Sequence, residues 1–564
     1  MYRVTGMFLG FFVLLCSPAL LLAQDDSIAA TSAHRMATDA AVEVMREGGS
    51  AADAAFSAAA VLTIVQPWFS SVMGGGTWAL YYDAEEDEVR ALDGVGPAAS
   101  GATSDFFLDS DNARRSGMHQ AVVPGAWAGW MEWLKAYGRR PLDELLEPAI
   151  EIAERGYEVY GEMAMWLGRG EEDIREWPHS REIYIRNGEL LEAGDVVTQA
   201  AMGATLRRIQ NVYRSNRAEG REEALEAAKD FFYRGPIAES IVEYSQSHGG
   251  LFELSDFSDF DTGLVEPISI DYEDITVYQN PPNSQGITML MGLKILEGYD
   301  FSDYTPDSAE SVHLQTEAIK VAHAAKHRYV GDPAFTDVPT EELLSEEHAR
   351  AARELISMDE PLGWPFPDTA DELEMSNTTT FSMVDEAGNA AAVTTSLGAQ
   401  FLVAGPSGVH INNRMRMMYY EPGYPNTVEP GKKVRHTSNP YIAFRDGELY
   451  ILGGNTGVDT QPQGQIQQFM SVVEFGLSPQ QAVSRPRFIT RGYPAGQWPF
   501  RAANDLGLEP GTPEELRREL AAMGHEVASN GIWGNAQMIL VDPDEGSMQT
   551  GTDPRGGVGK GTVE

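Results

Sequence analysis

The chain of 564 residues carries 84 acidic and 41 basic side chains, so its formal net charge is −43 at pH 7. A surface of this sign repels nucleic-acid backbones and anionic lipid, which excludes both as general partners. Hydrophobic residues make up 43% of the chain, enough for an enzyme-sized core, and the length predicts two domains or one large layered domain.

The first 23 residues have the pattern of a secretory signal peptide. Arg3 precedes an apolar run over 7–22, and Ala23 provides a cleavage site. The run is short for a bilayer and contains Pro18, so a membrane anchor is the alternative interpretation. We expect an exported protein, periplasmic or extracellular, with no stable membrane span.

The only cysteine, Cys16, lies inside this apolar run. Leu15 precedes it, whereas a bacterial lipoprotein signal requires a small residue there, so lipidation is disfavoured. Cleavage after Ala23 leaves a mature protein without cysteine. Disulfides, thiolate metal sites and cysteine nucleophiles are then excluded together.

Two helices are predicted after the signal. The first covers 34–47 and ends at a glycine pair. The second begins after Ser50, which forms a capping box with Asp53, and it ends before Pro67. Because this second helix is apolar on nearly every side, we expect it to be buried between layers. Three glycines at 74–76 then lead into a strand.

The pattern changes along the rest of the chain. Residues 120–360 are mainly helical, whereas 380–396 and 441–454 each contain two short strands around a glycine turn. This order predicts an α+β fold, with helices packed on both faces of a mostly antiparallel pair of sheets.

Standard metal and nucleophile motifs are not matched. His323 and His327 share one face of a predicted helix, but no glutamate follows the first histidine as a zinc protease requires. A solvated helix face is the favoured explanation of the pair. The Gly-x-Ser-x-Gly motif of α/β-hydrolases does not occur in the sequence. We therefore expect no metal and no cofactor.

Three consecutive threonines, Thr378, Thr379 and Thr380, stand at the start of a predicted strand. The ordinary explanation is that β-branched side chains favour strands. A threonine hydroxyl becomes a nucleophile when a base lies beside it, and the free α-amino group of an N-terminal threonine can be that base. An enzyme of this kind must first cut its own chain.

From about residue 30 to its end, the chain resembles the gamma-glutamyltransferases, a family of N-terminal-nucleophile hydrolases. The matching segments include EVMREGGSAADAA, NPPNSQGI, TTTFSMVDEAGNAAAVT and INNRM. The resemblance implies a four-layer αββα sandwich and self-cleavage of a zymogen between Asn377 and Thr378. The products would be a large subunit, 24–377, and a small subunit, 378–564, which together form one sandwich and act on a small amide or peptide.

The same resemblance assigns the catalytic groups. Thr378 would be the nucleophile, and Ser396 falls where the family places the hydroxyl that pairs with it, with Thr394 beside it. Backbone amides of Thr456 and Gly457 would form the oxyanion hole. Ordinary strand alternation is the alternative explanation for Ser396 and Thr394.

The substrate pocket departs from the family pattern. Val95 stands where the family has an arginine for the glutamyl α-carboxylate, and His436-Thr437 replaces a serine pair. The positions that normally meet the α-ammonium carry Gly398, Arg414 and Met417. A guanidinium in place of a carboxylate makes a poor ammonium pocket.

The sequence leaves two interpretations of the charged residues of this pocket open. Arg414, Arg435 and His436 could rebuild an anion site from other directions. Alternatively, Arg414 and its neighbour Arg416 face solvent or pair with some of the many acids.

Three functions are compatible with this sequence. The first is a self-processing enzyme that hydrolyses or transfers γ-glutamyl groups of glutathione-type amides through a threonyl acyl-enzyme. The second is an acylase of the same family for another acyl group, such as glutaryl. The third is a non-catalytic descendant, which the intact TTTFSMVD segment disfavours.

Overall fold

The computed structural model describes residues 28–109, 111–363, 378–398, 401–496, 500, 502–529, 531, 534–543 and 545–564. The predicted signal segment 1–23, Cys16 and Asn377 lie outside these residues. Among the helices described, none is both long and apolar enough to cross a bilayer.

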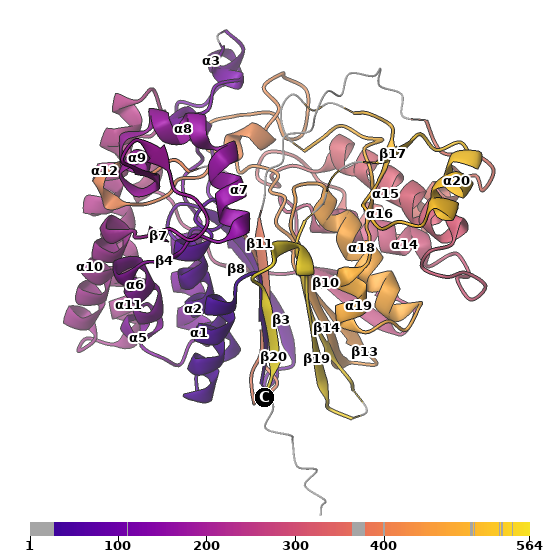
Figure 1. Cartoon of the computed structure of the whole chain (residues 1–564), viewed down its shortest axis with the longest axis horizontal. Coiled ribbons are helices and arrows are strands. Elements are labelled where there is room, and N and C mark those ends of the chain that lie inside the picture. The colour runs from indigo at the N-terminus through magenta and orange to yellow at the C-terminus, as the bar shows by residue number, and fades with distance from the viewer. Residues whose placement is uncertain are drawn as a thin grey trace, which may run out of the picture.

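Two antiparallel sheets face each other at the centre of the molecule (Figure 1). The first has the strand order β20 (Lys560–Val563), β1 (Ala29–Ser32), β11 (Thr379–Val384), β12 (Ala390–Ser396), β2 (Gly76–Asp83), β3 (Glu88–Gly94) and β8 (Leu264–Val265). The second has the order β19 (Met548–Thr552), β18 (Ala536–Val541), β14 (Glu448–Asn455), β13 (Tyr441–Arg445), β10 (Ile275–Gln279) and β9 (Ile268–Tyr272). Both predicted hairpins are therefore confirmed, as β11–β12 and β13–β14.

Helices cover the outer face of each sheet (Figure 1). The seven-stranded sheet is covered by α1 (Arg35–Arg46), α2 (Ala51–Val65), α4 (Ala126–Tyr137), α5 (Leu142–Leu145), α6 (Glu147–Arg155), α10 (Ala200–Asn216), α11 (Arg221–Tyr233) and α12 (Pro236–Ser247). The six-stranded sheet is covered by α14 (Gly286–Leu296), α15 (Ala309–Tyr329), α17 (Glu346–Arg353), α18 (Thr460–Val473) and α19 (Pro479–Ser484). The arrangement is the expected four-layer αββα sandwich.

Shorter elements complete the layers. The remaining helices are α3 (Ser104–Leu108), α7 (Gly161–Arg169), α8 (Glu171–Glu176), α9 (Pro178–Tyr184), α13 (Leu254–Ser258), α16 (Thr340–Leu343) and α20 (Glu514–Ala522). The remaining strands are β4 (Tyr157–Glu158), β5 (Ile185–Arg186), β6 (Glu189–Leu190), β7 (Val196–Val197), β15 (Phe488–Thr490), β16 (Leu506–Leu508) and β17 (Val527–Ser529). Among these strands, β15, β16 and β17 form a separate three-stranded sheet.

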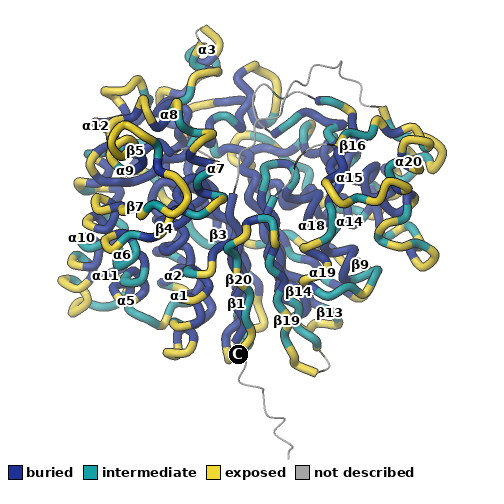
Figure 2. The backbone as a smooth tube through the Cα atoms, viewed as in Figure 1, coloured by how far each residue is buried: buried dark blue, intermediate teal, exposed yellow. Residues whose placement is uncertain are grey.

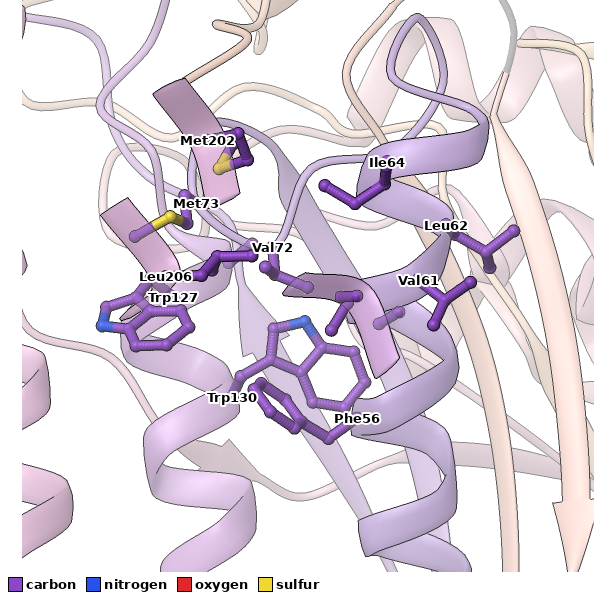
Figure 3. Close-up of a cluster of buried hydrophobic side chains, with 14 of the residues drawn as sticks. Phe56, Val61, Leu62, Ile64, Val72, Met73, Trp127, Trp130, Met202 and Leu206 are labelled. Carbon is purple, nitrogen blue, oxygen red and sulfur yellow. The ribbon is translucent and has the colours of Figure 1, made fainter. Parts of the chain in front are cut away.

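Helix α2 is the buried centre of the first helical layer. Its capping box joins Ser50 and Asp53 as predicted, and all fifteen of its residues are buried. Phe56 packs edge-on against Trp130, with ring centroids 5.7 Å apart, and the Trp127 ring centroid lies 6.2 Å from that of Phe56 (Figure 3). Because α2 is apolar on every side, it is covered both by the sheet and by other helices (Figure 2).

The register of the first sheet brings the predicted catalytic strands together. Thr379 pairs with Thr395 and Thr380 pairs with Thr394, so Thr378 stands opposite Ser396. Ser396 also pairs with Gly76 of β2 on its other side. Side chains alternate along a strand, so Thr378 and Ser396 point to the same face of the sheet.

The second sheet approaches this face closely. A Cβ added to Gly454 of β14 would lie only 2.0 Å from Thr380 Oγ1. The missing side chain therefore allows the two sheets to meet beside the start of β11. Loops from the second half of the sandwich consequently reach Thr378.

Candidate active site

The Thr378 side chain is buried at the start of β11, with 2% of the residue exposed. Its Oγ1 lies 3.1 Å from Ser396 Oγ, at the end of β12. The amide group of Gln461, in the first turn of α18, lies 3.1 Å from the same Thr378 oxygen. Groups from the sheet and from the second helical layer thus meet at one hydroxyl.

The hydrogen-bond network fixes the direction of the Gln461 amide. When its oxygen faces Thr378, it accepts the threonine hydroxyl, and its nitrogen donates to Thr437 O at 2.8 Å and to Asn439 Oδ1 at 3.0 Å. Both polar atoms of the Gln461 amide then have a suitable hydrogen-bond partner. Gln461 therefore links the nucleophile candidate to the loop that carries Thr437.

Arg414 points at the same hydroxyl pair from the 3-10 helix over Arg414–Met417. Its Nη1 donates to Ser396 Oγ at 3.0 Å, and its Nη2 donates to Asn413 Oδ1 at 3.0 Å. Burial, with a smaller effect of Arg416, lowers the pKa of Arg414 to about 9, so the side chain is still cationic at neutral pH. The structure therefore excludes the solvent-facing alternative for this residue.

The other predicted pocket residues surround Arg414. Met417 Sδ lies 3.7 Å from Arg414 Nη1 and 3.9 Å from Thr437 Oγ1. A Cβ added to Gly398 would lie 1.7 Å from Arg414 Nη2, so this glycine makes room for the guanidinium.

Val95 and His436 both lie beside Gly76, the residue that pairs with Ser396. A Cβ on Gly76 would lie 3.1 Å from His436 Nε2 and 3.5 Å from Val95 Cγ2. Burial, and then the charge of Arg414, hold the pKa of His436 well below its usual value. His436 is therefore neutral and does not add a positive charge to the pocket.

Two predicted site residues lie elsewhere. Thr394 Oγ1 lies 3.3 Å from Thr380 Oγ1, one pair further along the strands than Thr378. The guanidinium of Arg435 donates to the backbone carbonyls of Lys326 and Val330, so it is directed into the second helical layer. Strand pairing thus keeps Thr394 away from the hydroxyls of Thr378 and Ser396. The loop that carries Arg435 directs its side chain away from them.

The oxyanion prediction needs a correction at Thr456. Its backbone amide donates to Asn535 O at 3.0 Å, and its hydroxyl accepts from Asn535 N at 2.7 Å, so this amide is already used. Among the described residues, none accepts a hydrogen bond from the amides of Gly457 and Val458. Val458 has φ of 47°, which is strained for a β-branched residue and typical of functional loops.

Gln285 is a site residue that the sequence reasoning missed. Its Nε2 donates to both Thr437 O and Val458 O at 2.8 Å, so one side chain clamps the two loops beside Thr378. Lys326 Nζ lies 3.3 Å from Gln285 Oε1 and 2.6 Å from Asp459 Oδ1. Burial lowers the pKa of Lys326 to about 8, against the opposing effect of Asp459. Gln285 lies in the NPPNSQG segment, whose composition indicated only a loop and no functional residue.

The histidines noted in the sequence do not converge. His323 stacks on Tyr493 with ring centroids 3.8 Å apart, and His327 Nδ1 lies 2.6 Å from the Tyr419 hydroxyl. A different buried group, made of His313, Glu317 and His525, places potential ligand atoms within 4.8 Å of one another.

Protein groups already occupy those potential ligand atoms. His313 Nδ1 lies 2.8 Å from His525 Nε2, and Lys320 Nζ donates to Glu317 Oε1 at 2.8 Å. Glu317 Oε2 also accepts from the backbone amide of Leu362. The cluster therefore ties down the chain that leads toward Thr378, with Lys320 as its cation.

Comparison with known sequences agrees with this geometry. The sequence pattern described as gamma-glutamyltranspeptidase matches residues 37–562. The chain is 31% identical over 546 residues to the glutathione hydrolase proenzyme of Escherichia coli (strain K12), covering 93% of this chain and 90% of that protein. It is 30% identical over 533 residues to the glutathione hydrolase-like YwrD proenzyme of Bacillus subtilis (strain 168), covering 93% and 96%.

Acylases are similar to the same extent. The acylase ACY 1 proenzyme of Pseudomonas sp. (strain V22) is 29% identical over 527 residues, covering 91% of this chain and 89% of that protein. Among solved structures, the cephalosporin acylase from Bacillus halodurans superposes with a TM-score of 0.83 at 29% identity and covers 95% of both chains. The γ-glutamyltranspeptidase of Helicobacter pylori gives a TM-score of 0.54 at 28% identity, covering 58% of this chain and 91% of that chain.

Proposed function

Because the chain belongs to the gamma-glutamyltranspeptidase family, we propose that it is a self-cleaving amidohydrolase or acyltransferase whose nucleophile is Thr378. In the first reaction, Thr378 Oγ attacks the carbonyl carbon of Asn377. The peptide C–N bond breaks, an ester forms, and the hydroxyl proton passes to the new amine. Water then hydrolyses the ester, which frees the hydroxyl beside the new α-amino group of Thr378.

Turnover uses the same atoms. The freed amine of Thr378 takes the hydroxyl proton as Oγ attacks the acyl donor, and the same proton passes to the leaving amine. The amides of Gly457 and Val458 stabilise the oxyanion. Water or an acceptor amine then releases the acyl group, which gives hydrolysis or transfer. The observation that carries this assignment is the burial of the Thr378 hydroxyl against Ser396 and Gln461.

The two subunits of the proposed processing would remain associated. Strands β11, β12 and β20 of the small piece lie among β1, β2, β3 and β8 of the large piece in one hydrogen-bonded sheet. Separating the pieces would expose buried backbone groups and the facing sides of the two sheets. Export through the 1–23 segment completes the proposal, and sequencing of the mature large subunit's N-terminus tests it.

For the acyl donor, γ-glutamyl amides of the glutathione type are the first candidate, because relatives carry the name glutathione hydrolase. A second candidate is an anionic acyl group without an α-ammonium, such as glutaryl. The buried Arg414 favours this second candidate, because a cation beside the acyl pocket repels an ammonium. The ratio of kcat/KM for γ-glutamyl and glutaryl anilides tests the choice.

A further inference from the structure

We propose that Arg414 is a positioning residue that orients the Ser396 hydroxyl to donate its hydrogen to Thr378 Oγ1, both in self-cleavage and in turnover. This inference rests on the proposed role of Thr378 as the nucleophile. It gives Arg414 a function in the machinery of bond cleavage that does not depend on which acyl donor the enzyme uses.

The direction of the hydrogen bonds carries the first step. A guanidinium can only donate, so Ser396 Oγ is the acceptor in its 3.0 Å contact with Arg414 Nη1. The single hydroxyl hydrogen of Ser396 is then directed away from Arg414, and Thr378 Oγ1 lies 3.1 Å from Ser396 Oγ. Thr378 in turn donates to the Gln461 oxygen, which leaves its Oγ1 free to accept from Ser396.

Such a donor lowers the barrier to attack. As Thr378 loses its proton, negative charge develops on Oγ1, and a hydrogen bond donated to that oxygen stabilises the charge. Arg414 polarises the Ser396 hydroxyl, and its own positive charge lies two hydrogen bonds away from Thr378 Oγ1. Because all three residues are buried, these interactions are stronger than they would be in water.

The surroundings hold the guanidinium in one orientation. Nη2 donates to Asn413 Oδ1 at 3.0 Å, and Met417 Sδ lies 3.7 Å from Nη1. Gly398, with φ of 93°, leaves the space that the guanidinium occupies. Lysine has neither the planar fork nor the second nitrogen needed to contact Ser396 and Asn413 together.

The same contacts give Arg414 a role that differs from that of a substrate clamp. A bidentate carboxylate clamp uses two parallel N–H groups of one guanidinium. In this structure Nη1 and Nη2 are directed to oxygen atoms of Ser396 and Asn413. Arg414 therefore acts on the hydroxyl pair.

Self-cleavage of the newly made full-length chain provides a test without any substrate. Arg414→Gln and Arg414→Lys are compared with Arg416→Gln, which removes the same charge from the same 3-10 helix. The rate at which the precursor divides is followed by pulse–chase and gel electrophoresis. We expect Arg414→Gln to slow cleavage by about tenfold to a hundredfold, Arg414→Lys to be intermediate, and Arg416→Gln to differ by less than about threefold.

Turnover of the mature proteins adds a second measurement. We expect Arg414→Gln to lower kcat for both the γ-glutamyl and the glutaryl anilide, with KM for the glutaryl anilide changed by less than about threefold. Removing a nearby cation also raises the pKa of the Thr378 amine, so the acid limb of kcat/KM should move to higher pH. The other ionisable groups here are Arg416, neutral His436 and the Lys326–Asp459 pair behind Gln285, and this variant leaves them in place.

Wild-type cleavage by a folded Arg414→Gln protein would overturn the inference, as would a loss of turnover with only one of the two donors. Thermal unfolding shows whether the variant is folded, and a variant that does not fold is replaced by Gly398→Ala, whose methyl group would displace the guanidinium by direct contact. The proposed function fails separately, when Thr378→Ala still divides at the same bond.

Discussion

Thr378 Oγ1 and Ser396 Oγ lie 3.1 Å apart across two neighbouring strands, although 18 positions separate them in the chain. The tight turn between β11 and β12 sets the register that makes these residues partners. A hydroxyl pair fixed by strand pairing cannot drift with loop motion. This is the property that a nucleophile needs, because small displacements from the attack geometry are costly.

Thr378→Ala should abolish division of the precursor, because it removes the attacking oxygen. Thr378→Ser keeps the oxygen and should divide, at a reduced rate. Gel electrophoresis and N-terminal sequencing of the small piece, 378–564, check both results. A purified Thr378→Ala protein that still yields a piece beginning at residue 378 would refute the assignment of the nucleophile.

Ser396→Ala should slow both division and turnover by about tenfold or more, because Thr378 loses a hydrogen-bond donor in both reactions. Ser382→Ala is the matched control, since Ser382 is buried in the same strand pair and its hydroxyl has no partner among the described residues. The rates of precursor division and of anilide hydrolysis measure the effect. Equal rates for the two variants would show that the Ser396 hydroxyl has no special role.

Much of the sandwich could be predicted because it depends on local patterns. The Ser50–Asp53 capping box and the two glycine hairpins are encoded within a few residues of each other, and the structure confirms them. The pairing of Thr378 with Ser396 follows from one such hairpin, so this pairing could also be predicted from the sequence.

The loops around Thr378 depend on contacts that no local pattern contains. The Thr456 amide donates to Asn535, which is 79 positions away, so this amide is already used and is not available to the oxyanion that the sequence assigned to it. Gln285 and Gln461 were missed because glutamine in a loop or helix start carries no distinctive signal. Their role appears only when three separate loops are brought together.

Buried histidines should make the fold sensitive to acid. His410 is fully buried, its Nε2 lies 2.6 Å from the Tyr184 hydroxyl, and burial lowers its pKa to about 3. The unfolded chain binds this proton near pH 6.5. The histidine therefore contributes stability that is present above pH 6.5 and is lost progressively as the pH falls toward 3.

His410→Gln should reduce the steepness of this loss between pH 6.5 and 4, because one proton fewer is taken up on unfolding. Denaturant unfolding at several pH values measures the slope. A wild-type slope in His410→Gln would mean that His410 titrates alike in both states.

The acyl pocket leads to the last prediction, which concerns the donor. Arg414 lies beside the hydroxyls of Thr378 and Ser396, and Met417 occupies a position where a carboxylate would be needed to neutralise an α-ammonium. A γ-glutamyl donor brings an ammonium next to this cation, whereas a glutaryl donor does not. We expect kcat/KM for glutaryl anilide to equal or exceed that for γ-glutamyl anilide at one pH.

Met417→Asp should reverse this preference, because its carboxylate would pair with Arg414 and offer an acceptor to the ammonium. We expect the ratio of γ-glutamyl to glutaryl kcat/KM to rise by about tenfold or more, in line with the value of one buried charge contact. Met417→Leu keeps the size and the apolar character of the side chain, so its ratio should stay near that of the wild type. A wild-type enzyme that strongly prefers the γ-glutamyl donor, with a ratio insensitive to Met417→Asp, would show that the ammonium binds elsewhere and that Arg414 does not select the donor.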